Sequence, residues 1–189
     1  NTTGTKNTAI GTQSLDANST ASNGTAVGYR ALTSNTTGAN NTAVGTDALL
    51  TNTTGTGNTA VGTTASDAMT TGTYSTSLGF AALSTATTPN YNVAIGASAL
   101  QFTTTGYQNT AVGTSALAAN TTGADNVAVG FAALDAQTTS NGNTAVGYQA
   151  GTAFTSSGLT AIGYQSAFSM TTGYDSVALG SFALYTNTT

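Results

Sequence analysis

The chain has 189 residues and very little charge: two Lys or Arg and six Asp, a formal net charge of -4, and no His, Cys, Trp or Glu. Two cations cannot form the clustered basic surface that nucleic-acid binding requires. No apolar run approaches the ~18 residues of a membrane-spanning helix, so we expect no membrane span within this segment. The absence of cysteine excludes a disulfide framework.

A 17-residue repeat organises the whole chain. Each copy ends in a motif of the form Asn-Thr-Ala-Val-Gly, and successive glycines stand 17 residues apart, with one interval of 16. A fixed period of this kind is typical of solenoids, so we interpret residues 1–189 as a single repeat array. Both ends of the chain read Asn-Thr-Thr in the same phase of the repeat, which predicts a piece of a longer fibre that continues end to end. The glycines are Gly11, Gly28, Gly45, Gly62, Gly79, Gly96, Gly113, Gly130, Gly147, Gly163 and Gly180.

The motif before each glycine predicts a short β-strand. In the copy from Asn41 to Gly45, the aliphatic Val44 precedes the glycine and Thr42 stands two residues earlier. Alternation along a strand places these two columns on one face, and we expect that face to line a dry interior together with the Leu column of Leu49. The Ala between them is expected to face a neighbouring strand or a partner chain. The repeated glycine is expected at a corner with positive φ.

Seventeen residues leave no room for a helix, a return strand and two turns. The sequence therefore predicts an all-β fold, a parallel β-solenoid (β-roll) with one repeat per coil and about eleven coils stacked over roughly 50 Å. The apolar content of one coil is small, which favours several chains sharing a core. We expect a homotrimer, with the Ala columns or the corner aromatics at the contact. These aromatics are Tyr29, Phe80, Phe131, Tyr148 and Tyr164.

The strand motifs resemble the head repeats of trimeric autotransporter adhesins of the YadA type. The relevant runs are Asn41 to Gly45, Asn92 to Gly96 and Asp175 to Gly180. The resemblance implies a left-handed parallel β-roll assembled as a trimer, although the 17-residue period is longer than the coil of typical adhesin heads. The run from Asn143 to Gly151 is also similar to repeats in phage tail fibres.

No group of residues predicts catalysis, a cofactor or a metal site. Asp16, Asp67 and Asp135 share one column of the repeat but lie three or more coils apart, ~14 Å or more on a stacked model. Paired catalytic carboxylates lie closer together than that. The Gly-Gly-x-Gly-x-Asp ladder of calcium-binding β-rolls is absent. We therefore expect that the segment is not an enzyme.

The turn after the Leu column has the form Asn-Thr-Thr-Gly and predicts two surface features. Its Asn residues lie in Asn-x-Ser/Thr sequences, which makes Asn18, Asn35, Asn52 and Asn120 candidate glycan acceptors. Its first Thr column is a candidate surface ladder that could order water. Adjacent Thr residues point in opposite directions, so the other interpretation is that one column caps the turn while the next meets solvent. The ladder comprises Thr36, Thr53, Thr70, Thr87, Thr104, Thr121, Thr138 and Thr171.

These observations predict a structural or adhesive segment of an extracellular fibre, on a cell surface or a virion. Its expected partners are other copies of itself and a host-surface protein or glycan. Aromatic residues in the irregular copies, such as Tyr74, Tyr91 and Tyr174, either make such contacts or fill a trimer interface. The alternative is a monomeric ice-binding or surface-layer β-solenoid with Thr ladders.

Overall fold

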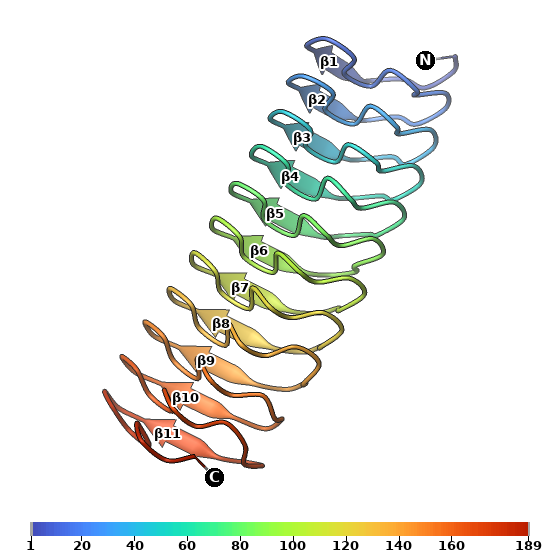
Figure 1. Ribbon diagram of the computed structural model, residues 1–189. Coiled ribbons are helices and arrows are strands. Elements are labelled where there is room, and N and C mark those ends of the chain that lie inside the picture. Colours follow the sequence, from blue (N-terminus) through green and yellow to red (C-terminus); the bar gives the residue numbers. More distant parts are fainter. Residues whose placement is uncertain (1, 189) are drawn as a thin grey trace.

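The computed structural model describes residues 2–188, and these form one parallel β-solenoid. Eleven strands of three residues each make a single sheet in chain order, and the coils stack along one axis with the chain ends at opposite ends of the stack (Figure 1). The predicted all-β architecture with one repeat per coil is confirmed. The strands are β1 (Thr8–Ile10), β2 (Thr25–Val27), β3 (Thr42–Val44), β4 (Thr59–Val61), β5 (Thr76–Leu78), β6 (Val93–Ile95), β7 (Thr110–Val112), β8 (Val127–Val129), β9 (Thr144–Val146), β10 (Thr160–Ile162) and β11 (Val177–Leu179).

Every strand pairs with its neighbours in the register that the repeat predicts. Thr42 lies beside Thr59 in the next coil, and the three columns of the strand motif stay aligned along the sheet, with Val beside Thr in some coils, as at Thr76 and Val93. The 16-residue copy keeps this register, with Thr144 beside Thr160. Its missing residue lies in the turn between Thr155 and Leu159, since the backbone amide of Thr155 still bonds to the carbonyl of Thr171, and Leu159 takes the place of the usual Asn.

The interior is lined by Ala and Leu, not by the Val and Ile column that we expected. The central Ala of β3, Ala43, is fully buried, whereas Thr42 and Val44 on either side of it are partly exposed. The prediction that Val and Ile line the interior was therefore wrong, because alternation points them to the outside of the coil. The small Ala faces the interior of its own coil, where it packs in one cluster with the buried Leu residues, and the expectation that it faces a partner chain was also wrong.

In three coils the large and the small residue of the core have changed places. In most coils Leu stands four residues after the corner glycine and a polar or small residue stands three further on, as at Leu49 and Asn52. In the other three coils the first residue is small and the second is large, apolar and fully buried. A Cβ at Gly151 would lie 2.9 Å from Leu159 Cδ2, so neighbouring side chains already fill this space. The exchange conserves core volume, which is how substitutions in a core are tolerated best. The exchanged pairs are Ser66–Met69, Gly151–Phe154 and Ala167–Met170.

Tight corners require left-handed backbone at three further positions in each coil. In the coil after β3 these are Asp47 (φ 59°), Leu49 (φ 50°) and Gly57 (φ 70°). A non-glycine residue in this region costs about 1–2 kcal/mol. Each of the three amides donates to a carbonyl of an adjacent coil, for example Leu49 to Ala65 at 3.0 Å, and these bonds offset the strain.

The corner glycine has a steric reason as well as a conformational one. Gly45 has a φ of 135°, and a Cβ there would lie 2.6 Å from the carbonyl oxygen of Gly62 in the next coil. All eleven corner glycines have positive φ, so the predicted corner is confirmed. The corners bring the backbones of successive coils into direct contact, and they fix where the outer face of the sheet ends.

Candidate functional surface on the outer face of the sheet

The outer face of the sheet is uncharged, regular and exposed, and it combines a column made mostly of Thr with a column of aliphatic residues. It consists of the first and third residues of every strand, and the residue after each corner glycine, here called the corner column, borders it. None of these positions carries a charged side chain. Several of its large apolar residues are between 36% and 64% exposed. They are Ile10, Leu78, Val127, Ile162, Val177 and Leu179. A patch of this kind, continuous along a molecule, marks an interaction surface more often than scattered single residues do.

The threonines of the outer face keep their hydroxyls free. Within residues 2–188 the hydroxyls of the first-position threonines make no hydrogen bond to another protein group, and these side chains are exposed or partly exposed. The face therefore presents one Thr hydroxyl and one aliphatic side chain in most coils. Sequence reasoning missed this column because it assigned the same residues to the interior. The threonines are Thr8, Thr25, Thr42, Thr59, Thr76, Thr110, Thr144 and Thr160.

The corner column carries exposed aromatic rings in some coils and small residues in others. Phe131 and Tyr148 stack with ring centroids 5.2 Å apart and planes 13° apart, and Tyr148 stacks on Tyr164 at 5.3 Å and 9°. Tyr29 and Phe80 have only Thr or Ala at this position in the adjacent coils, and all five rings are 43–62% exposed. Aromatic side chains of this exposure contribute large contact areas when a partner covers them.

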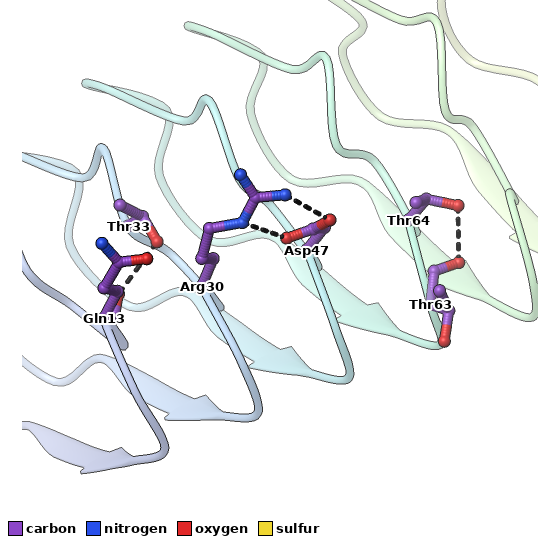
Figure 2. A network of polar contacts seen from close by, with 6 residues as sticks. All are labelled: Gln13, Arg30, Thr33, Asp47, Thr63 and Thr64. Atoms are coloured by element: carbon purple, nitrogen blue, oxygen red, sulfur yellow. Dashed lines mark hydrogen bonds and ion pairs between the residues drawn. The ribbon is translucent and has the colours of Figure 1, made fainter.

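An ion pair lies beside the corner column, outside the outer face. Arg30 Nε donates to Asp47 Oδ1 at 2.8 Å and Nη2 donates to Oδ2 at 2.7 Å, so the pair bridges two adjacent coils (Figure 2). The hydrogen bond to Asp47 raises the pKa of Arg30, and the guanidinium also lies 5.1 Å from the ring centroid of Tyr29. In the same view the hydroxyl of Thr33 donates to the carbonyl of Gln13 at 2.9 Å. These side chains bond between coils, whereas Thr64 in the same view donates to the carbonyl of Thr63 in its own coil.

The predicted Thr ladder of the turns is present, but its hydroxyls are occupied. Seven of the eight donate to the carbonyl oxygen of the equivalent residue in the next coil, as Thr104 does to Thr121 at 3.1 Å. Thr138 is the exception, and Ser140 bonds instead to the carbonyl of Thr155 at 2.6 Å. The second Thr column, such as Thr105, is exposed. One column caps the turn while the other meets solvent, as one of the two interpretations predicted.

The four candidate glycan acceptors lie inside the coil. Asn18 is 3% exposed, and Asn35, Asn52 and Asn120 are fully buried. Each Nδ2 donates to the carbonyl three residues further on, for example Asn35 to Gly38 at 3.0 Å. The placement argues against the predicted glycan attachment, because the acceptor amide must be reached by an enzyme at the surface. These amides close the turn instead.

The three carboxylates of the shared column also stay apart, in the turns after β1, β4 and β8. Asp16 is exposed, while Asp67 and Asp135 are partly buried. Burial raises the pKa of both partly buried carboxyls above the ordinary value. Among the described residues, no cluster of three or more His, Cys, Asp or Glu side chains could hold a metal ion, and no pocket is found.

Within residues 2–188 there is no helix long and apolar enough to cross a membrane. Comparisons of the chain with protein-family models, with curated proteins and with solved structures found no match. The outer face of the sheet is therefore interpreted from its own chemistry.

Proposed function

We propose that the chain is a rigid structural segment of an extracellular fibre and that it associates with copies of itself, as a homotrimer, through the outer face of the sheet. The observation that carries the proposal is an exposed, uncharged face with a continuous aliphatic column that runs the length of the stack. Burying that face against water is favourable at about 25 cal/mol per Å² of apolar area. Another copy of the chain brings no like-charge repulsion to this face.

The area of the face suits self-association. Eleven coils at ~4.8 Å and a face about 15 Å wide give on the order of 750 Å² per copy. A stable interface buries about 800 Å² per partner, so the whole face matches one such interface, and in a trimer each copy divides it between two neighbours. The resemblance of the strand motifs to adhesin heads and tail fibres supports the same assembly and a location on a cell surface or virion.

A spacer role follows from how the coils are joined. Backbone and side-chain hydrogen bonds run from each coil to the next over the whole stack, as from Asn109 Nδ2 to the Gly123 carbonyl at 2.8 Å. The rod also offers few Lys or Arg residues as sites for trypsin-like proteases. In this proposal, exposed aromatic residues outside the face, such as Tyr174 at 80% exposure, bind a host protein or glycan.

Light scattering coupled to size-exclusion chromatography tests the proposal. We expect a mass of three times the 18.4 kDa of one chain. Val112→Lys together with Val129→Lys places charges on the outer face and should yield monomers with unchanged circular dichroism. The matched control, Thr105→Lys with Thr122→Lys, charges the exposed turn and should remain trimeric. A parent chain that is monomeric at all concentrations contradicts the proposal.

The free hydroxyls of the outer face favour a second candidate, an ice-binding surface on a monomer. Thr42, Thr59 and Thr76 occupy successive coils and present hydroxyl and methyl groups side by side in register. Because the turn ladder uses its hydroxyls internally, the strand column is the surface on which this candidate depends. Inhibition of ice recrystallisation by a monomeric parent, lost on Thr59→Lys, would support it over the fibre segment.

A further inference from the structure

The outer face poses a problem of register for any assembly of copies. Its strand columns hold Thr or Val at the first position and Val, Ile or Leu at the third in every coil, so a copy displaced along the axis by one coil, ~4.8 Å, meets side chains of similar size and shape. Register is weakly specified in strands that lack distinguishing side chains. Residues that differ from coil to coil must therefore distinguish the correct alignment from the displaced ones.

The corner column supplies such residues. Its aromatic members follow β2, β5, β8, β9 and β10, and the remaining coils have Thr, Ala or Ser. With no displacement, all five rings of one copy lie level with rings of another copy that runs in the same direction. If one copy is displaced by one or three coils, only two of its rings lie level with a ring of the other copy. If the displacement is two or four coils, only one ring does. The five rings are Tyr29, Phe80, Phe131, Tyr148 and Tyr164.

We infer that the aromatic residues of the corner column fix the register in which copies of the chain pair across the outer face. The inference rests on the proposed self-association and names the residues that make it specific. The strand columns supply most of the buried area, and the rings select one alignment. At any other alignment a ring lies level with a small residue and loses its aromatic contacts.

Disulfide trapping tests this inference, because the chain has no cysteine of its own. Val112→Cys and Val129→Cys place single thiols on the outer face of adjacent coils. The two variants, each with a different mass tag, are mixed, assembled and oxidised. We expect cross-links between identical positions to exceed cross-links between the two positions by tenfold or more.

A second experiment removes the rings. In both cysteine variants, Phe131→Thr, Tyr148→Thr and Tyr164→Thr should leave the assembled mass unchanged and bring the two kinds of cross-link to comparable yields. The matched control replaces Phe102 and Tyr107 by Thr, because these exposed aromatics lie outside the outer face and the corner column, and should keep the tenfold preference.

The outcomes separate the two proposals. A preference for identical positions that survives removal of the three rings overturns the assignment of register to the corner column while self-association stands. Equal yields in the parent overturn it as well. A monomeric parent in light scattering overturns the self-association itself, and with it the inference.

Discussion

Two columns of threonine run the length of the solenoid and do opposite things. In the turn, Thr104 donates its hydroxyl to the carbonyl of Thr121 in the next coil at 3.1 Å. In the strand six residues later, Thr110 has no such partner and points out of the sheet. The difference shows that what a polar residue does here depends on whether the next coil offers it a bonding group. Partnered columns hold the stack together, and unpartnered columns present a surface.

The buried Asn residues divide in the same way. Asn109 has a partner for each polar atom: its Nδ2 donates to Gly123, its Oδ1 accepts from the amide of Asn126, and its backbone amide donates to Asn92. Asn120 is equally buried, but its Oδ1 accepts no hydrogen bond. Its Nδ2 bonds to the same Gly123 carbonyl at 3.2 Å. The two residues thus form a matched pair in neighbouring positions of the core.

The largest expected effect comes from breaking the partnered member of this pair. Asn109→Ala leaves the buried Asn126 amide without its acceptor, at a cost of about 1–3 kcal/mol, and removes one of the two acceptors of Asn126 Nδ2, which keeps its bond to the Ser140 carbonyl. We expect a loss of about 2–4 kcal/mol in the free energy of unfolding by urea denaturation. Asn120→Ala removes an unsatisfied acceptor together with the donor on the same side chain. Its loss in the free energy of unfolding should be smaller than that of Asn109→Ala by about 1 kcal/mol or more. Equal losses for the two variants would contradict the role given to axial partners.

A smaller effect is expected for the threonines themselves. Thr104→Val keeps the shape of the side chain and removes the bond to Thr121, so it should cost about 1 kcal/mol. Thr110→Val loses no bond within the chain and favours strand, so the free energy of unfolding should change by less than about 0.5 kcal/mol. Urea denaturation of both variants in a monomeric background, with Val112→Lys and Val129→Lys, isolates the coil from its assembly. A larger loss at Thr110 than at Thr104 would reverse the comparison.

The sequence predicted the repeat architecture because period and register are properties of the whole chain. The spacing of glycines such as Gly45 and Gly62 predicted the strands, the corners and one repeat per coil. One of the two interpretations of the turn was that one threonine caps it while the next meets solvent, and the hydroxyls divide in this way, since adjacent residues point in opposite directions. These features depend on backbone alternation and on glycine stereochemistry, which a sequence shows directly.

The assignment of inside and outside was not predictable in the same way. Alternation places Thr42 and Val44 together on one face but does not say which face is buried. Hydrophobicity suggested the wrong answer, because the narrow coil admits only the methyl group of Ala43 beneath the strand. The left-handed backbone at Leu49 was equally hidden, since Leu rarely takes that conformation. The burial of the candidate glycan sites was hidden for a related reason: their Asn residues match a surface motif but close buried turns.

The smallest expected effect concerns a carboxylate with one buried oxygen that accepts no hydrogen bond. Asp47 binds Arg30, whereas Asp135 has a buried Oδ1 with no hydrogen bond, and burial raises the pKa of its carboxyl. A pKa that is higher in the folded than in the unfolded chain means that protonation favours folding. The contribution of Asp135 is fully present below the unfolded value of about 3.9 and is lost as the pH rises through the raised pKa. Thermal unfolding midpoints should therefore fall as the pH is raised through this window, and Asp135→Asn should weaken that dependence. Burial also raises the pKa of Asp67, so the double variant Asp67→Asn with Asp135→Asn should weaken the pH dependence further. A pH dependence identical to that of the parent would contradict the prediction.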